Sequence, residues 1–353
     1  MPMLAEFVDA VVGVDTHRDT HEAEIASPTG TPIATIKISN DSAGYAELLG
    51  WIFQQAPGQR VAVSIEGTRS YGAGLARAVA AAGLMVIECE QPHRKTRRGK
   101  GKSDPIDAHL AVLSALRLDA DRLPTPRADG NREALRILLG ARAELTTAST
   151  GQTNRLRALL LSGDDAERQT ARGALTETAL ASLVQRRPPR ETSPAQAVRH
   201  AEIRRLAVAL REAARALKDN RQQLQAIVDE LAPGLTEQPG IGPVSAAQTI
   251  VSFSHSGRCR NEGAFSALAG TSPLPASSGR TVRHRLNRGG DRALNRALHT
   301  IALTRMRHCP KTRAYVARRT AEGKTTREIR RCLKRYIARQ LYRTLTTAMT
   351  PTT

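Results

Sequence analysis

The stretch "VVGVDTHRDTHEAEIASPTGTPIATIKI" (residues 11–38) decides the fold that the sequence predicts. It begins with a short apolar strand, "VVGVD", that ends on Asp15. A second strand, "HEAEIAS", and a third, "PIATIKI" (32–38), follow, and the turn-forming residues Ser27 to Gly30 join them. Three strands in succession therefore open the chain.

Helix and strand then alternate. A helical spacing of apolar residues in "AGYAELLGWIFQQA" (43–56) is followed by a strand, "VAVSIEG" (61–67), which also carries an acid at its end. An alanine-rich helix closed by Gly83, the strand "LMVIECE" and the helix "DPIDAHLAVLSAL" (104–116) complete the series. This order of elements is that of an α/β, RNase H-like (RuvC-like) domain, which we place at residues 1–125.

Long helices are expected in the middle of the chain, residues 126–234, on either side of the break "QRRPPRETSP". Apolar residues recur every seventh position in the second helix and have a companion row. The two rows are Ile203, Leu210, Leu217, Leu224 and Leu231, and Leu206, Ala213, Asn220 and Ile227. Such a seam is typical either of a dimerising coiled coil or of a helical hairpin within one chain, and the pattern leaves both open.

The last part, residues 235–353, is expected to be helical. Its segment "PGIGP" (239–243) resembles a helix-hairpin-helix turn, in which Gly240 and Gly242 would let backbone N–H groups approach a phosphate. A Gly-Ile-Gly turn alone is a weak signal, but in a basic domain it favours contact with a nucleic-acid backbone.

Charge is unevenly distributed along the chain. Residues 1–90 hold 5 Lys and Arg against 11 Asp and Glu, while the whole chain has a net charge of +20. A basic body indicates a polyanion partner, normally nucleic acid, although a ribosomal-type or merely soluble basic protein has the same composition. No apolar run suits a membrane span, no secretory signal is expected at the N-terminus, and the four scattered cysteines are typical of a cytosolic protein.

Four acids occupy the ends of predicted elements. Asp15 and Glu66 each end a strand, while Asp104 and Asp107 begin a helix and share one face of it. Carboxylates gathered in this way repel one another unless divalent cations neutralise them, and oxygen-only ligands favour Mg²⁺ or Mn²⁺. Two such ions can catalyse phosphodiester transfer. Each acid taken singly also has a simpler role as a helix cap, a first-turn charge or a turn residue.

Two basic segments complete the candidate site. The run "HRKTRRGKGK" (93–102) precedes the helical acids and would hold a nucleic-acid backbone, or form a plain basic loop. The segment "PASSGRTVRHRLNRGG" (275–290) combines an accessible hydroxyl with phosphate-binding arginines. The cations concerned are Arg94, Lys95, Arg97, Arg98, Lys100 and Lys102 in the first segment and Arg280, Arg283, Arg285 and Arg288 in the second. Aromatic residues are 3% of the chain, which argues against base stacking as a general mode of binding.

Motifs from one end of the chain to the other resemble a known family. "GVDTHRD", "KSDPIDAHLA" and "FSALAGTSPLPASSGRTVRHRLNRGGDRALNRAL" are similar to successive motifs of insertion-sequence transposases with a DEDD-type, RuvC-like nuclease domain, the insertion sequence 110 family. The resemblance implies that Asp15, Glu66, Asp104 and Asp107 are a metal-binding tetrad for Mg²⁺ or Mn²⁺. It also implies that Ser278 is a nucleophile that becomes joined to DNA, with the adjacent Ser277 as the less favoured position.

The same resemblance implies a bacterial cytosolic recombinase that works at the nucleoid, excises and inserts its own element, and is directed by a structured guide RNA. It further implies a homo-oligomer, dimer or tetramer, whose active sites combine a tetrad and a serine from different chains. Two other functions are compatible with parts of the sequence. A structure-specific nuclease such as a Holliday-junction resolvase needs the acids but no serine, and an architectural nucleic-acid binder needs neither.

Overall fold

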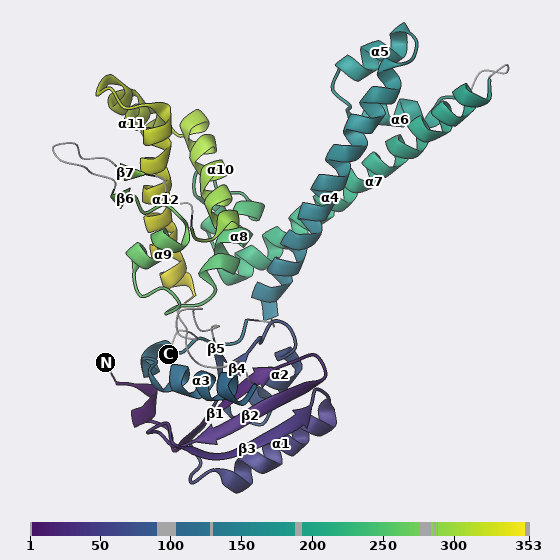
Figure 1. Cartoon of the computed structure of the whole chain (residues 1–353). Helices are drawn as coiled ribbons and strands as arrows, with labels where there is room; N and C mark the ends of the chain where they lie inside the picture. The colour runs from purple at the N-terminus through teal and green to yellow at the C-terminus, as the bar shows by residue number, and fades with distance from the viewer. Residues whose placement is uncertain are drawn as a thin grey trace.

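The computed structural model describes residues 2–89, 104–127, 130–187, 193–275, 284–285, 287 and 289–349. Figure 1 shows three parts. A sheet domain lies at one end, and from it a long helical hairpin and a group of C-terminal helices extend as two separate arms.

The sheet domain contains a mixed five-stranded sheet in the order β3-β2-β1-β4-β5. Its strands are β1 (Ala10–Thr16), β2 (Thr20–Ala26), β3 (Pro32–Ser39), β4 (Val61–Glu66) and β5 (Met85–Cys89). The first three pair antiparallel, and β4 and β5 extend the sheet in parallel on the other side of β1. The five predicted strands are confirmed, and this arrangement is consistent with an RNase H-like domain.

Helices cover both faces of the sheet. α1 (Ser42–Gln55) and α2 (Ala73–Ala81) bury Leu48 and Val79 against one face, in a core with Val12. α3 (Asp104–Leu116) buries Val112 against the other, in a core with Val11. Because side chains alternate along a strand, odd-numbered residues of β1 face α3 and even-numbered ones face α1 and α2. Short 3₁₀ turns, η1 (Leu4–Glu6) and η2 (Ala120–Arg122), flank the domain.

The hairpin arm consists of two long helices, α4 (Gly130–Leu161) and α7 (Pro194–Leu231), which lie side by side in Figure 1. Both long helices were predicted. Two short helices at the tip, α5 (Asp165–Arg172) and α6 (Glu177–Gln185), were not singled out from the sequence.

The seven-residue seam of α7 packs within the chain. Ile203, Leu210 and Leu224 of the main row are buried, and Ile203 and Leu210 share a core with Leu156 and Leu160 of α4. Asn220 of the companion row is also buried, and its Nδ2 donates a hydrogen bond to the carbonyl oxygen of Leu138 at 2.9 Å. The buried part of the seam is therefore covered by α4, as in the intramolecular alternative.

The C-terminal arm is mainly helical, as expected. It comprises η3 (Leu235–Glu237), α8 (Pro243–Phe253), α9 (Glu262–Leu268), a short β6 (Leu274–Pro275) and β7 (His284–Arg285), α10 (Arg292–His308), α11 (Pro310–Ala321) and α12 (Thr326–Ala348). Phe253, Phe265 and Tyr342 meet in its core with ring centroids 5.9 to 6.0 Å apart. Leu135 and Leu224, from the base of the hairpin, belong to the same core. Among the helices that the structure describes, none has an apolar stretch long enough to cross a bilayer.

Candidate active site and nucleic-acid interface

Asp15 and Glu66 occupy neighbouring positions at the carboxyl ends of two parallel strands. β1 and β4 pair with Val14 opposite Ile65, so the next residue of each strand is one of the two acids. Asp15 is only 6% exposed, and its Oδ2 lies 3.4 Å from Nε2 of His17. Two acids that stand 51 positions apart in the sequence are thus brought to one edge of the sheet.

α3 crosses the sheet directly beside these acids. Asp15 lies two residues after Gly13 and therefore on the same face of β1, and at Gly13 the strand touches the backbone of Ala108. Asp107, one residue before Ala108, is consequently held near the same end of the sheet. Asp104 begins α3 one turn earlier, but its side chain lies outside the part of the chain that the structure describes.

A contact between buried Glu24 and half-buried His109 links α3 to the sheet. Glu24 of β2 stands opposite Gly13 in the strand register, is 6% exposed, and lies 2.6 Å from Nδ1 of His109. Sequence reasoning did not select either residue. The sequence offers one indication, which is an acid in β2 on the face of the sheet that α3 covers. Its burial can be recognised only when the position of α3 on the sheet is known.

The donor set at this edge suits a hard divalent cation. Asp15, Glu66 and Asp107 offer carboxylate oxygens, which Mg²⁺ and Mn²⁺ prefer over nitrogen or sulfur. Within the described side chains, no group of three His, Cys, Asp or Glu residues could hold a metal ion. The type of ligand atom suits the predicted metal, and metal binding at this edge stays a prediction.

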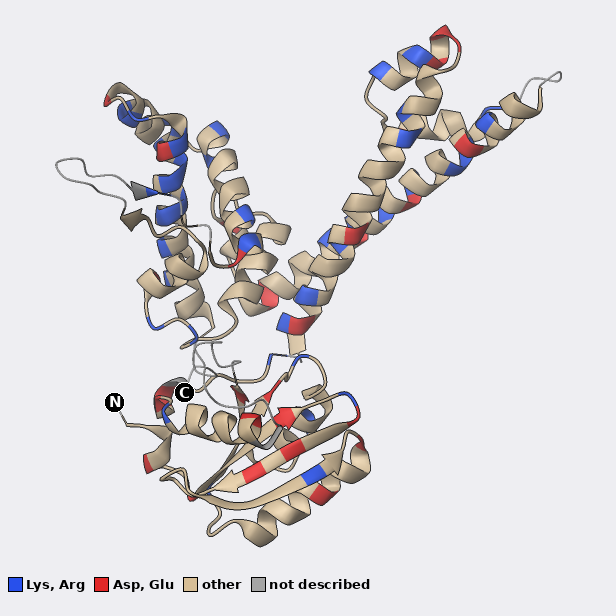
Figure 2. Ribbon diagram, in the orientation of Figure 1, with Lys and Arg blue, Asp and Glu red and all other residues tan. Residues whose placement is uncertain are grey.

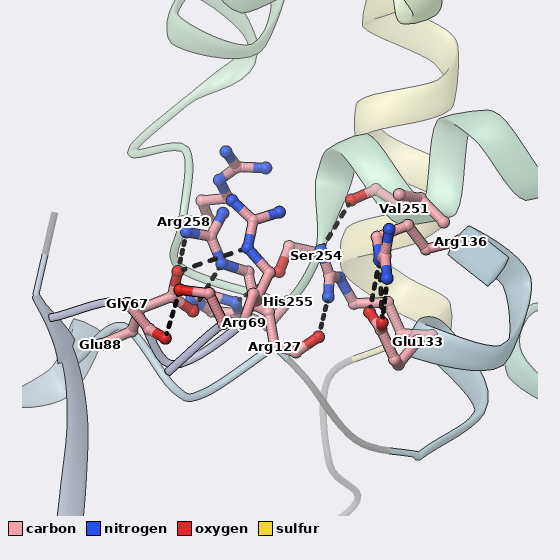
Figure 3. Close-up of polar contacts among 12 residues, drawn as sticks. Gly67, Arg69, Glu88, Arg127, Glu133, Arg136, Val251, Ser254, His255 and Arg258 are labelled. Carbon is pink, nitrogen blue, oxygen red and sulfur yellow. Dashed lines mark hydrogen bonds and ion pairs between the residues drawn. The ribbon is translucent and has the colours of Figure 1, made fainter. Parts of the chain in front are cut away.

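Arginines surround Glu88 where the sheet domain meets the C-terminal arm (Figure 3). Arg127 donates to Glu88 through Nε at 2.6 Å and also through Nη2, and both residues are buried. Arg69, from the turn after β4, lies 3.9 Å from the same carboxylate. Arg258, from the loop after α8, donates to the carbonyl oxygen of Ser252 at 2.6 Å. We call Glu88, Arg69, Arg127, Arg132 and Arg258 the Glu88 cluster.

The Glu88 cluster carries an excess of positive charge. Burial, together with the nearby guanidinium groups of Arg127 and Arg258, lowers the pKa of Arg132 to about 10. Burial and the same cations also lower the pKa of His255, which keeps that imidazole neutral. Glu88 balances part of this charge through its ion pairs with Arg127 and Arg69, at the edge of the sheet domain that faces the C-terminal arm.

In the sequence, two short strands flank residues 276–283, which include Ser277 and Ser278 and which we call the serine segment. β6 pairs antiparallel with β7, with Leu274 opposite Arg285 and Pro275 opposite His284. Pro275 and His284, the described residues on either side of this segment, therefore lie next to each other, and Arg285 is exposed there. Ser277, Ser278, Arg280, Arg283 and Arg288 lie outside the described residues, as do Arg94, Lys95, Arg97, Arg98, Lys100 and Lys102 of the first basic segment.

The glycine turn before α8 is engaged within the chain. Gly240 has a φ of 78° and packs against α10, where Nε of Arg305 donates to the carbonyl oxygen of Pro239 at 2.6 Å. The N–H of Gly242 donates to Oγ of Ser245 at 3.1 Å. The N–H of Gly242 is therefore engaged within the chain, and contact of this turn with a nucleic-acid backbone stays a prediction.

Basic residues gather on the C-terminal arm instead. Figure 2 shows Lys and Arg in successive bands along α12, while acids mark the strands of the sheet domain. Figure 1 also shows β6 and β7 well away from the sheet domain that carries Asp15 and Glu66. The structure thus keeps the two strands that flank Ser277 and Ser278 in the sequence apart from Asp15 and Glu66 within one chain.

Two protein families match separate parts of the chain. Residues 12–163 match the DEDD transposase model of IS110, described as a transposase, and residues 232–317 match the model described as transposase IS116/IS110/IS902 family. The first match includes β1, β4 and α3 with all four acids, and the second includes the serine segment.

Curated relatives are similar over nearly the whole chain. An uncharacterized 43.6 kDa protein of insertion element IS110 from Streptomyces coelicolor is 24% identical, covering 91% of this chain and 90% of the relative. An uncharacterized 44.8 kDa protein of insertion element IS116 from Streptomyces clavuligerus is 26% identical, covering 88% of each. A 42 kDa protein of IS900 from Mycobacterium paratuberculosis is 24% identical over 88% of this chain and 89% of the relative. With both family models matched in order along one chain, this protein is a DNA transposase that belongs to the IS110/IS116/IS902 family.

Proposed function

We propose that this transposase excises and inserts its element by metal-dependent strand cleavage followed by a covalent serine–DNA ester. The observation that carries the proposal is the pairing of β1 with β4, which makes Asp15 and Glu66 neighbours beneath the start of α3. Family membership and the excess of Lys and Arg in the C-terminal arm support DNA as the substrate.

The four carboxylates would hold Mg²⁺ or Mn²⁺, which when bound stabilises the attacking and leaving oxygens of a phosphodiester. Asp15 and Glu66 are carried by strands buried on both sides, so packing of the sheet domain holds the backbone of both residues. Asp104 and Asp107 come from α3, which the contacts at Gly13 and Glu24 hold against the sheet. Such a rigid frame keeps the carboxylates close together although their negative charges repel one another.

In the serine step, Oγ of Ser278 gives up its proton and attacks phosphorus, and the phosphorus–oxygen bond to one deoxyribose breaks. That deoxyribose oxygen leaves as a hydroxyl after taking up a proton. A hydroxyl of the recipient strand later attacks the same phosphorus, which restores the serine and joins the DNA. The ester conserves the phosphodiester bond, so neither an oxidant nor a nucleotide cofactor is required.

We further propose that each active site draws its acids and its serine from different protomers of a dimer or tetramer. The separation of β6 and β7 from the sheet domain within one chain supports this arrangement (Figure 1). The buried part of the seam of α7 is covered by α4, so the proposed oligomer would use other surfaces.

A structured guide RNA encoded by the element is proposed to select the target. The support is the family resemblance together with the net charge of +20, which favours a nucleic-acid partner. Sequencing the RNA that copurifies with the protein tests this part, and a single structured species encoded beside the gene is expected. A mixture that mirrors total cellular RNA would contradict it.

The covalent step separates a recombinase from a resolvase-like nuclease, which uses water. On a nicked suicide substrate, the wild type should form a denaturant-resistant adduct, and peptide mapping should place the DNA on Ser278. Ser278→Ala should abolish both adduct and joining, whereas Ser149→Ala, in α4, should leave them unchanged. An adduct on Ser277 would move the nucleophile by one residue. Cleavage without any adduct in a variant lacking both serines would identify a nuclease.

A further inference from the structure

A cavity of about 670 Å³ lies between α12 and the segment that leads into β6. Gly270 and Pro273 line one side, and Arg285 of β7 lies on the same wall. Its volume falls within the range of about 300–1,000 Å³ that is usual for sites of small ligands. Because β6 begins directly after Pro273, the cavity borders the strands from which the serine segment departs.

The charged lining of this cavity is predominantly basic. Arg331, Lys334, Arg335 and Arg339 come from successive turns of α12, and Arg285 joins them. Glu328 is the acid among the described lining residues, and its carboxylate already accepts hydrogen bonds from the N–H and hydroxyl of Thr325 at the start of α12. Arg339 pairs with Glu262, outside the lining, at 2.7 Å. Arg331 and Arg335 have no ion pair with an acid among the described residues, which favours an anionic ligand.

Two of these cations, Arg335 and Lys334, are partly buried and can donate a hydrogen bond to a ligand. Nη1 of Arg335 is buried and has no hydrogen-bond partner among the described atoms. Lys334 donates to Oδ1 of Asn295 at 2.6 Å, and burial together with nearby Arg292 lowers the pKa of its ammonium group. A buried donor without a hydrogen-bond partner destabilises the protein. A ligand that accepts a hydrogen bond from Arg335 removes this cost, which increases the affinity for that ligand.

An aromatic ring lies beside these cations. Tyr336 lines the cavity and is 54% exposed, although aromatic residues are scarce in this chain. Its ring meets Tyr315 of α11 edge to face, with centroids 6.0 Å apart and planes at 86°, which fixes its orientation. An exposed, oriented ring next to guanidinium groups is the combination that binds an unstacked base together with its phosphate.

We propose that this cavity holds one unpaired nucleotide of the bound nucleic acid, with its phosphate on Arg335 and Lys334 and its base against Tyr336. The proposal rests on the proposed function, because an unpaired nucleotide beside β6 and β7 would hold the strand next to the serine segment. DNA and RNA share this chemistry, and the two are distinguished by experiment.

Photocrosslinking of a short single strand to the full-length protein tests the proposal. The probes are a pentanucleotide of DNA and one of RNA, each with 5-iodouracil at its centre, since this base crosslinks to an aromatic ring on which it stacks. The expected product maps to Tyr336 by mass spectrometry, and the preferred probe identifies the strand. A crosslink that maps only outside the cavity would overturn the proposal.

Affinity measurements with matched variants complete the test. Tyr336→Ala should weaken pentanucleotide binding by about 5- to 150-fold, and Tyr336→Phe should restore it. Arg335→Gln should lower the slope of log affinity against log salt by about 0.7, the value for one phosphate contact on a single strand. Arg330 is on α12 but does not line the cavity. Arg330→Gln should therefore have a smaller effect on both the affinity for the pentanucleotide and its salt dependence. Equal affinities for wild type and Tyr336→Ala would contradict the proposal.

Failure of this site and failure of the proposed function give different results. Binding and crosslinking are measured with chelator present and in the Ser278→Ala background, so neither depends on catalysis. A crosslink at Tyr336 in a protein that never forms a serine adduct would retain the cavity and reject the recombinase chemistry. The reverse result would retain the chemistry and reject the cavity.

Discussion

Gly13 and Ala108 are in backbone contact where α3 crosses β1. A side-chain carbon on Gly13 would overlap the carbonyl oxygen of Ala108 and come within 2.8 Å of the backbone nitrogen of Val112. Gly13 has an ordinary strand conformation, so the glycine is required for this close approach and not for backbone freedom. The contact sets the distance between α3 and the strand that carries Asp15.

Replacing Gly13 should therefore damage the active site more than the nucleic-acid surface. Gly13→Ala should force α3 away from β1 and destabilise the fold by about 1–3 kcal/mol, the usual cost of overpacking. We expect strand cleavage to fall at least tenfold while DNA binding persists, as measured by a cleavage assay and a filter-binding assay. Gly50→Ala, in α1 with open space around the new carbon, is the control and should be neutral or stabilising. Full cleavage by Gly13→Ala would mean that the spacing of α3 is not critical.

Loss of the charge on Asp107 should separate catalysis from binding. Asp107→Asn keeps the size of the side chain but removes a metal ligand, so cleavage should fall below detection while DNA binding is retained. Chelation should stop the wild type in the same way, with Mg²⁺ or Mn²⁺ restoring activity. Glu47→Gln, exposed on α1 at the opposite face of the sheet, serves as the control and should cleave normally. An active Asp107→Asn variant would remove this residue from the tetrad.

The Glu88 cluster should contribute strongly to stability. Glu88→Gln leaves the guanidinium of Arg127 buried without its counter-charge, which typically costs about 3–5 kcal/mol. Denaturant unfolding should show the loss, and limited proteolysis should reveal earlier separation of the sheet domain from the C-terminal arm. Glu322→Gln breaks an exposed pair with Arg319 and should change stability little. Equal effects of the two substitutions would refute the structural role of the cluster.

Stability should decrease in mildly acidic solution partly because of His255. Burial and neighbouring arginines lower the pKa of His255 below its ordinary value of 6.5, so the unfolded chain binds a proton more readily than the folded one. His255 therefore has no effect on the free energy of unfolding well above pH 6.5. As the pH falls below that value, His255 lowers the free energy of unfolding increasingly. Between pH 7.5 and 5.5, thermal unfolding should show a smaller loss of stability for His255→Gln than for wild type. Parallel curves for the two proteins would rule out this contribution.

Local patterns in the sequence determined the elements of the sheet domain. The short apolar runs in "VVGVD" and "VAVSIEG" predicted two strands with an acid at the end of each, and the structure ends β1 and β4 around those acids. The seven-residue repeat likewise predicted α7, because an apolar run and a period of about 3.5 residues depend only on neighbouring positions. The repeat does not indicate whether α7 packs against a partner chain or against α4, since either of them can bury an apolar seam.

Only the tertiary structure decided which distant residues meet. Glu88 is separated from Arg127 and Arg258 by long stretches of chain, and nothing in a local pattern states which of many arginines will lie beside one acid. The cavity at Tyr336 depends in the same way on the approach of α12 to Gly270 and Pro273. Secondary structure follows from short-range periodicity, whereas charge clusters and cavities follow from how the elements pack, because packing brings together residues that are far apart in sequence.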